Sequence, residues 1–426
     1  MLFNFKKTID QQRLSIETLS AFILLTSIVS PASAFSTEDF DNSIENALKF
    51  GQDGQYGQIK FDLRYRYENS NTKPAGTLPD TANASTIRLR LGYLTPEFHG
   101  LQAYAEYEGN QDIGANTYNS IRNGKAQYDV IADPQQNELN QFWLSYKGLT
   151  DTEIKVGRQR IKLDNDRFIG NVGWRQMEQT YDAAMITNTS LPNTTIKVGY
   201  ITRVQDIFAR ENDIDSQFVN IGYDIKGVGK LTGYSYLLDF NEAKGQNMNS
   251  NQTYGVRFDG GHQVTEDFKA LYTAEYAFQK DHGNNPINKF DGVDYYNAMA
   301  GVSAFGVTAK VGWEQLDGQD GLGFRTPLGT NHAFQGWADL FLVTPANGIR
   351  DIYGLITTNV MSVKLLGVYH DFDDDTGHIN YGKEYDFLAV KKFGKHYSLL
   401  AKYAYYDADN FGTDTQKFWL QAGVSL

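Results

Sequence analysis

The sequence has no cysteine, only 9 prolines and 7 histidines in 426 residues, and no apolar run beyond its first 34 residues that could form a spanning helix. Without cysteine, disulfide bonds and thiolate metal sites are excluded. Without runs of about 20 apolar residues, a bundle of transmembrane helices is excluded. Basic residues are also scarce, at 39 Lys and Arg against 51 Asp and Glu. The resulting net charge of -12 argues against nucleic acid as a partner.

The amino terminus has the pattern of an export signal. Three basic residues precede the apolar run LSAFILLTSIVS, which ends in PASAFS with Ala32 and Ala34 at cleavage-site spacing. We therefore expect residues 1–34 to be a secretory signal peptide. The chain beyond it is then exported.

Residues 35–56 have a different hydrophobic pattern from the rest of the chain. Phe40, Ile44 and Leu48 lie four residues apart behind acidic residues, which predicts a short amphipathic helix within 36–50. We expect this segment at the periplasmic side or at a pore mouth, followed by one domain over residues 57–426.

From Ile59 onward apolar and polar residues alternate, as in IKFDLRYRYE, within a chain that has 27 Tyr and 26 Phe. Alternation fits either a half-buried soluble sheet or a membrane barrel. About eighteen such runs follow, each near ten residues, the length a tilted strand needs to cross a bilayer. Short connectors alternate with long polar ones, and the last run, QKFWLQAGVSL, ends at Leu426. These features predict an all-β, transmembrane antiparallel barrel of about 18 strands in the bacterial outer membrane.

This prediction implies partners. We expect a monomeric barrel that contacts outer-membrane lipid and lipopolysaccharide and is inserted by the outer-membrane assembly machinery. No cofactor is expected.

Charged residues on the strands must face the lumen, because an Arg or Lys facing lipid at mid-bilayer costs about 2 to 4 kcal/mol. Eighteen strands enclose a water-filled channel rather than a packed core. Basic residues concentrate in the first third of the chain, which favours an anion path, although any barrel lumen is polar and mixed. The predicted lumenal residues are Lys60, Asp62, Arg64, Arg66, Glu68, Arg88, Arg90, Glu106, Glu108, Lys155, Lys197 and Arg203.

In residues 156–183 the alternation breaks, and Arg158, Arg160, Arg167 and Arg175 lie among aspartates and glycines. Such a loop could fold into the lumen as a constriction. Its guanidinium groups suit carboxylates, to which they donate paired hydrogen bonds.

The stretch GRQRIKLDNDRFIGNVGWRQMEQTYDA, residues 157–183, resembles the alginate export family of outer-membrane barrels. The stretch TPLGTNHAFQGWADLFLVTPANGIRDIYG, residues 326–354, and LRYRYE near the start carry the same resemblance. It implies an eighteen-stranded barrel and, as in that family's alginate exporter, a pore whose basic residues conduct a polyuronate. By this resemblance the role falls on Arg64, Arg66, Arg88, Arg90, Arg158, Arg160, Arg167 and Arg175.

The sequence thus predicts a passive channel for anionic solutes, such as a polyuronate saccharide or a small anion, with an arginine-lined pore. Two alternatives stay open. One is a less selective sugar or general porin. The other is a barrel hydrolase, although seven scattered histidines and no nucleophile motif disfavour an enzyme.

An acidic loop, HDFDDDTGHINYGKE, begins at His370. Asp371, Asp373 and Asp375 are weak candidates for calcium, because the glycine falls one place late for an EF-hand. A solvated acidic loop is the simpler interpretation, so no metal site is predicted.

Overall fold

The computed structural model describes residues 37–72, 79–241, 249–283, 285 and 292–426. The predicted signal peptide lies outside these ranges. Helix α2 (Thr37–Ala47) confirms the predicted amphipathic helix, and a 3-10 turn, η1 (Gln52–Gly54), links it to the strands. Among the described residues, no helix has the length and apolar character needed to cross a bilayer.

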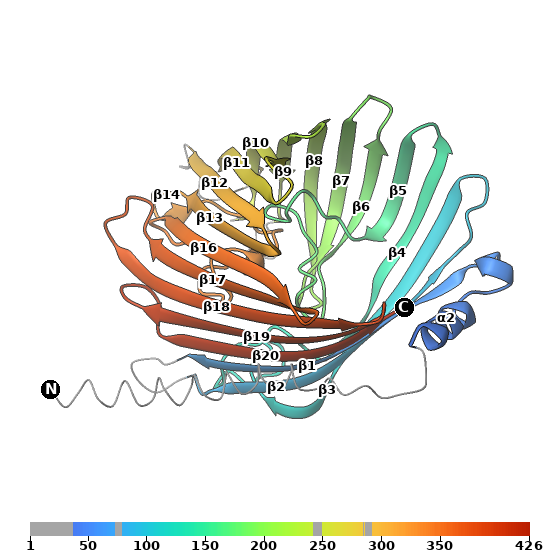
Figure 1. Ribbon diagram of the computed structural model, residues 1–426, viewed down its shortest axis with the longest axis horizontal. Coiled ribbons are helices and arrows are strands. Elements are labelled where there is room, and N and C mark those ends of the chain that lie inside the picture. The colour runs from blue at the N-terminus through green and yellow to red at the C-terminus, as the bar shows by residue number, and fades with distance from the viewer. Residues whose placement is uncertain (1–36, 73–78, 242–248, 284, 286–291) are drawn as a thin grey trace.

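Eighteen strands form one antiparallel sheet, as the sequence predicts (Figure 1). Each pairs with the next along the chain, and β1 also pairs with β20, with Tyr65 opposite Ala422, which closes the barrel. The strands are β1 (Gln58–Thr72), β2 (Ala82–Leu94), β3 (Leu101–Thr117), β4 (Gln136–Leu149), β5 (Thr152–Gln159), β6 (Thr180–Asn188), β7 (Thr194–Gln205), β8 (Glu211–Ile225), β9 (Gly229–Leu238), β10 (Asn251–Gln263), β11 (Phe268–Asp281), β12 (Val293–Ala304), β13 (Val307–Leu316), β16 (Ile349–Val360), β17 (Val363–Asp373), β18 (Asn380–Phe393), β19 (Tyr397–Ala408) and β20 (Thr415–Ser425).

The two ends of the barrel differ. Helix α2 and the carboxyl terminus lie together at one end (Figure 1), where Glu45 accepts a hydrogen bond from His396 in the β18–β19 turn. The turns at this end are short, such as Phe305 and Gly306 between β12 and β13. Because outer-membrane barrels have short periplasmic turns, we call this the periplasmic end and the other the extracellular end.

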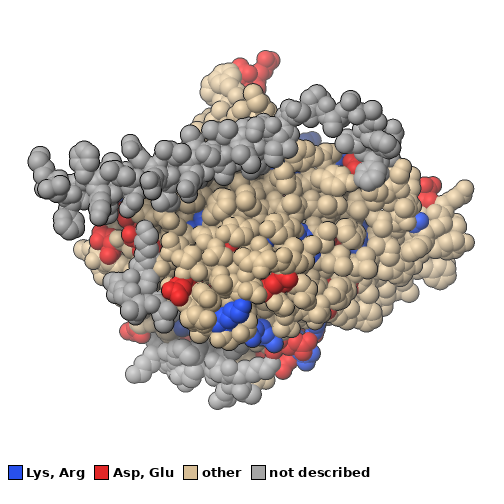
Figure 2. Space-filling view, turned by 90° about the horizontal axis from the view of Figure 1, so that it is seen from below, with Lys and Arg blue, Asp and Glu red and all other residues tan. Residues whose placement is uncertain are grey.

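The outer face of the barrel is apolar. Large hydrophobic side chains stay exposed at alternate positions, among them Phe142, Leu144 and Val311, while their neighbours in sequence point inward. Figure 2 shows one side of this wall, on which uncharged residues predominate across the middle. Exposed apolar residues in this pattern form the lipid-facing surface of a membrane barrel.

Two long loops turn back into the barrel. Loop A, residues 160–179, follows β5, and loop B, residues 317–348, follows β13 and contains the small hairpin β14 (Gly318–Gln319) and β15 (Leu322–Gly323) and the turn η4 (Asn331–Ala333). The loops meet at a backbone hydrogen bond from Gly170 to Leu328, with nitrogen and oxygen 2.9 Å apart. Side chains from strands around the whole barrel contact them, which is possible only from the lumen.

The facing of β13 gives a first prediction. Val311→Arg places a guanidinium on the lipid face and should lower the free energy of unfolding by about 2 to 4 kcal/mol, whereas Lys310→Arg, one residue away and facing the lumen, should change it little. Urea unfolding of the protein in lipid vesicles, followed by tryptophan fluorescence, measures the difference. Equal losses in both variants would contradict the assigned faces.

Candidate functional site: the lumenal constriction

The first two strands present their charged side chains to the lumen. Arg64 and Arg66 on β1 are both buried, while Tyr65 between them is exposed on the outer face. Arg64 Nε lies 2.8 Å from the Gln176 side-chain oxygen, and its other nitrogens donate to backbone carbonyls of loop A. Arg64 therefore holds a loop in place and is not exposed in an open pore.

Most of the other predicted arginines are paired with carboxylates. Arg88 bonds Asp62 on the neighbouring strand, and Arg90 bonds Glu108 and lies 3.5 Å from Glu178 of loop A. Arg160 reaches Glu106 at 2.8 Å and also bonds Glu178. Lys60, by contrast, faces the lumen with no carboxylate within 4.0 Å among the described residues. The basic first third of the chain is thus largely neutralised.

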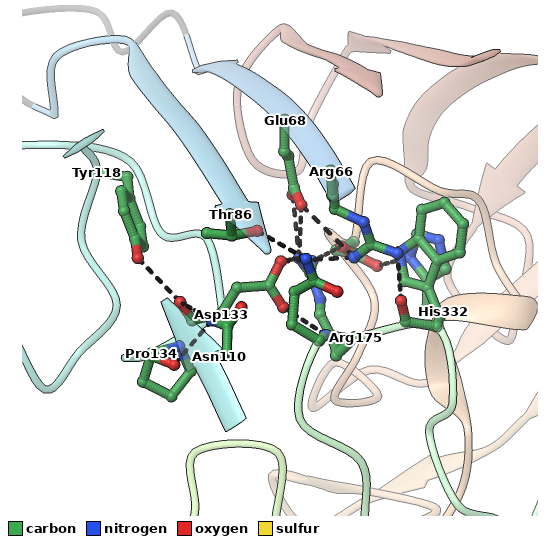
Figure 3. Close-up of polar contacts among 12 residues, drawn as sticks. Arg66, Glu68, Thr86, Asn110, Tyr118, Asp133, Pro134, Arg175 and His332 are labelled. Atoms are coloured by element: carbon green, nitrogen blue, oxygen red, sulfur yellow. Dashed lines mark hydrogen bonds and ion pairs between the residues drawn. The ribbon is translucent and has the colours of Figure 1, made fainter. Parts of the chain in front are cut away.

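Arg175 is the centre of this network (Figure 3). Its guanidinium lies 2.9 Å from Glu68 on β1 and 3.2 Å from Asp339 of loop B, so one side chain joins the wall to both loops. Asp133, from the loop after β3, lies among the same groups, 3.4 Å from Arg66 and 3.9 Å from Arg175. Burial and three carboxylates have opposite effects on the Arg175 pKa, and the net effect is a raised pKa. Arg175 is therefore a permanent cation.

Loop A also crosses to the opposite wall. Arg167 lies 3.1 Å from Glu314 on β13, and its guanidinium lies over the ring of Phe334 in loop B, 4.6 Å from the ring centre. Since Arg175 holds the same loop to β1, loop A spans the lumen. Loops A and B together narrow the channel at mid-height.

A lysine in a cage of aromatic rings fixes loop B. The ammonium of Lys402 on β19 lies 3.7 Å from the ring centre of Trp337, 4.2 Å from that of Trp174 and 5.3 Å from that of Trp419. These rings come from loop B, loop A and β20, and they are three of the five tryptophans in the sequence. A desolvated cation over tryptophan faces is held by about 2 kcal/mol or more.

The Lys402 ammonium also donates to His332, with the two nitrogens 2.7 Å apart. The other His332 nitrogen lies 2.6 Å from Asp339, and the imidazole stacks on Trp174 at an interplanar angle of 7°. We call Lys402, its three tryptophans, His332 and Asp339 the latch. None of the latch was predicted from sequence, although HAFQGWAD lies within the stretch that carries the family resemblance.

The charges around the latch fix the protonation of His332. Burial lowers its pKa to about 3, and the ammonium of Lys402 and the guanidinium of Arg175 act in the same direction, against Asp339. Burial by itself raises the pKa of Asp339, but His332, Lys417 and Arg175 outweigh it and hold that pKa well below its usual range. His332 is therefore neutral in the latch, donating to Asp339 and accepting from Lys402.

Two predicted pore residues, Arg158 and Arg203, lie elsewhere. Arg158 lies opposite Phe142, on the same face of the sheet as the exposed Val156, so its side chain leaves from the outer face. Arg203 shares the parity of the lumenal Lys197, but Ile201 and Arg203 lie opposite the adjacent residues Ala183 and Asp182. Thr202 is thus an extra, bulged residue, which reverses the facing of Arg203. A strand bulge of this kind is invisible to an alternation pattern.

These two arginines form an ionic cluster at the extracellular rim. Arg158 lies 2.7 Å from Asp182 and 2.8 Å from Glu211, and Arg203 lies 2.8 Å from Asp213. The prediction that they line the pore was wrong. Their contacts join β5 to β8 at the point where β5 leaves the wall for loop A.

The weak calcium candidates do not converge. Asp373 pairs with Arg350 at 2.7 Å, Asp375 accepts the backbone N–H of Gly318 at 2.8 Å, and Asp371 shares the outer parity of Tyr369. In the described part of the chain no cluster of His, Asp and Glu side chains could hold a metal ion.

A ring of lysines surrounds the periplasmic mouth. Nine strands start at that end, and seven carry an inward-facing lysine within their first four residues. The register establishes the facing: Lys230 lies beside the exposed Leu231, and Lys310 beside the exposed Val311. The lysine ring is Lys60, Lys155, Lys197, Lys230, Lys269, Lys310 and Lys364. Only Lys60, Lys155 and Lys197 were predicted from the sequence, although lysine soon after a short turn is a pattern that the sequence displays.

The lysines of the ring are mostly free of acids. Lys155 lies 3.8 Å from Glu153 and 4.5 Å from the ring centre of Trp143. The other six have no carboxylate within 4.0 Å among the described residues. The ring therefore places net positive charge at this end of the lumen.

Comparison with known proteins agrees with this architecture. The family model for alginate export matches residues 55–324. The chain belongs to the alginate export family. No curated protein matches this family member. Family and fold together establish a channel in the bacterial outer membrane rather than a soluble protein.

Several solved porins have the same fold as this alginate export family protein. OccK9 (OpdG) of Pseudomonas aeruginosa is 12% identical, with a TM-score of 0.71 over 89% of this chain and 100% of its own. A BenF-like porin of Pseudomonas fluorescens Pf-5 is 14% identical, with a TM-score of 0.68 over 87% and 99%. OpdK of Pseudomonas aeruginosa, solved with vanillate, is 12% identical, with a TM-score of 0.69 over 86% and 98%. At these identities the likeness is one of fold.

The latch gives a second prediction. Lys402→Met removes the cation that joins both loops and should shift the loops toward a released state about 30-fold, because about 2 kcal/mol of cation–ring attraction is lost. In planar bilayers we expect larger and noisier single-channel currents than for wild type. Lys391→Met, on the neighbouring strand and facing outward, is the matched control. Unchanged currents in Lys402→Met would show that the loops are held without the cage.

The neutral state of His332 in the latch gives a third prediction. In released loop B its pKa returns to about 6.5, so between pH 6.5 and about 3 only the released state binds a proton there. Each pH unit below 6.5 therefore favours release up to tenfold. Asp339, whose pKa is lowered, contributes nothing to this change above pH 5.

We expect channel noise to rise as the pH is lowered from 7.5 to 5 in wild type, and to rise less in His332→Gln. The control His378→Gln, in an exposed loop, should behave as wild type, and a pH response retained in His332→Gln would contradict this origin.

Proposed function

We propose that this protein is a passive outer-membrane channel that favours anions, with its selectivity set by the lysine ring at the periplasmic mouth. The observation that carries the proposal is the six inward lysines without a carboxylate partner. Fixed positive charge around an aqueous pore attracts anions and repels cations.

Acids at the same level are fewer and mostly engaged. Asp62 bonds Arg88, Glu153 lies near Lys155, and Asp259 lies 2.9 Å from Arg257. The paired charges nearly cancel at a distance, so the unpaired ammonium groups dominate the field. Selectivity therefore lies with the lysines and not with the predicted arginines, whose partners neutralise them.

The buried arginines have a structural role in this proposal. Arg64, Arg66 and Arg175 are largely shielded from the lumen by the loops they hold. Replacing one would release a loop and enlarge the channel before it changed the preference for anions. The constriction is in this sense built by arginines, while anions are selected by lysines.

The solute class follows from charge and width. The family suggests a polyuronate such as alginate, which carries a carboxylate on every sugar. Loops A and B cross the lumen, so we infer that short uronate oligomers or small anions pass in the latched state and a polymer only after the loops move. Passage in either direction follows the concentration gradient.

Reversal potentials in a KCl gradient across a planar bilayer test the proposal. Wild type should prefer chloride, and Lys60→Gln combined with Lys197→Gln and Lys230→Gln should move the preference toward potassium, because three of the unpaired charges are removed. The matched control combines Lys226→Gln and Lys395→Gln, which lie in periplasmic turns. Cation preference in wild type, or an unmoved potential in the triple variant, would overturn the proposal.

A further inference from the structure

A cavity of about 530 Å³ lies in the lumen under loop B. Its roof is the segment around Phe334 and Trp337, and its walls are strands β10 to β13, β16 and β17. Lys402 and His332 of the latch also line it. A volume in the range of about 300 to 1,000 Å³ accommodates small organic ligands.

Most charged groups that line the cavity are already paired. Arg257 lies between two carboxylates, 2.6 Å from Glu275 and 2.9 Å from Asp259. Glu314 lies 3.1 Å from Arg167, and His370 lies 2.9 Å from Asp351. Lys402 is enclosed by the tryptophan cage. That leaves Lys310, which has no carboxylate within 4.0 Å among the described residues. Outside that cage, Lys310 is therefore the cation of this lining that has no ion-pair partner among the described residues.

An apolar surface adjoins that cation. Lys310 lies directly opposite Leu355 on β16, and Leu355 lies opposite Val368 on β17. Directly opposed residues on one face have β-carbons about 5 Å apart, so the three side chains form a row across the lumenal wall. Leu366 extends the apolar part along β17, and Trp337 faces it from loop B. Inward-facing leucine and valine are unusual in a water-filled barrel, whose interior is normally polar.

A glycine positions the lysine. Gly301 on β12 is the other neighbour of Lys310, and a β-carbon there would lie 2.8 Å from the Lys310 γ-carbon. The lysine stem therefore passes over Gly301, in space that a larger residue would occupy. Asp386, beyond Val368 in the same row, is buried and accepts a hydrogen bond from the backbone N–H of Trp337 at 3.2 Å.

We propose that this cavity is a binding station for aromatic monocarboxylates, with the carboxylate on the Lys310 ammonium and the ring against Leu355, Leu366 and Val368. It rests on the proposed function in one respect, since the solute reaches the cavity through the channel. A sugar acid offers the same charge but would bury hydroxyl groups against leucine and valine, which has a free-energy cost when they lack partners. The cavity therefore discriminates among anions by the polarity of the ring.

Block of single-channel current tests this assignment, with three probes added from the periplasmic side: benzoate, glucuronate and benzyl alcohol. Benzoate has ring and charge, glucuronate the charge with a polar ring, and benzyl alcohol the ring without charge. Benzoate should block at a concentration about tenfold below those of the other two. Lys310→Met should raise its half-blocking concentration about tenfold, as loss of a charged hydrogen bond predicts. Lys226→Met, which removes an exposed lysine of the β8–β9 turn outside both the cavity and the ring, should leave it unchanged.

A second variant distinguishes loss of the binding site from failure of the barrel to fold. Leu366→Gln should weaken benzoate block while the KCl reversal potential stays that of wild type, which also shows that the barrel has assembled. Equal block by benzoate and glucuronate, or no effect of Lys310→Met, would overturn the binding station and leave the anion channel standing. Cation preference in KCl with benzoate block still dependent on Lys310 would overturn the proposed function and retain the station.

Discussion

Charge compensation inside the barrel is the constraint on which this structure depends. Guanidinium and carboxylate groups are costly on the lipid face at mid-bilayer, so the alternating strands place them in the lumen, where loops A and B exclude most of the water. A charge buried in this way is costly unless it is paired, and removing one partner of such a pair costs about 3 to 5 kcal/mol. The contacts of Arg175 with Glu68 and Asp339 meet this demand and tie the loops to the wall in the same step.

The same constraint gives arginines and lysines different roles, although the sequence prediction treated both as pore-lining residues. A paired arginine contributes rigidity but little electric field in the lumen, because the charge of its carboxylate partner cancels its own charge at a distance. An unpaired lysine contributes electric field and little rigidity, since its ammonium ties no loop to the wall. The chain uses Arg64, Arg66 and Arg175 at the constriction and Lys60, Lys230 and Lys310 at the mouth. A prediction that treats all basic residues as pore lining therefore overestimates the contribution of the arginines to selectivity and underestimates that of the lysines.

The fold was predictable because each strand carries its own evidence in two-residue alternation, strand length and connector length. The lumenal facing of Arg64 and Arg88 followed from the same local pattern. The facing of Arg203 did not, because the bulge after Ile201 is defined by the pairing of β7 with β6. The latch was beyond sequence reasoning for a related reason. Trp174, Trp337 and Lys402 lie far apart in the chain, and no local pattern shows that they meet.

The position of the cavity links solute binding to loop position. Trp337, His332 and Lys402 belong to the latch and also line the cavity, so a solute that contacts Trp337 loses that contact when loop B is released. Binding that occurs only in the latched state must stabilise that state, by a factor that grows with solute concentration over its dissociation constant. The stabilised state is the narrow one. A solute that occupies the cavity therefore holds the channel in its narrow form, whereas protonation of His332 favours the released form.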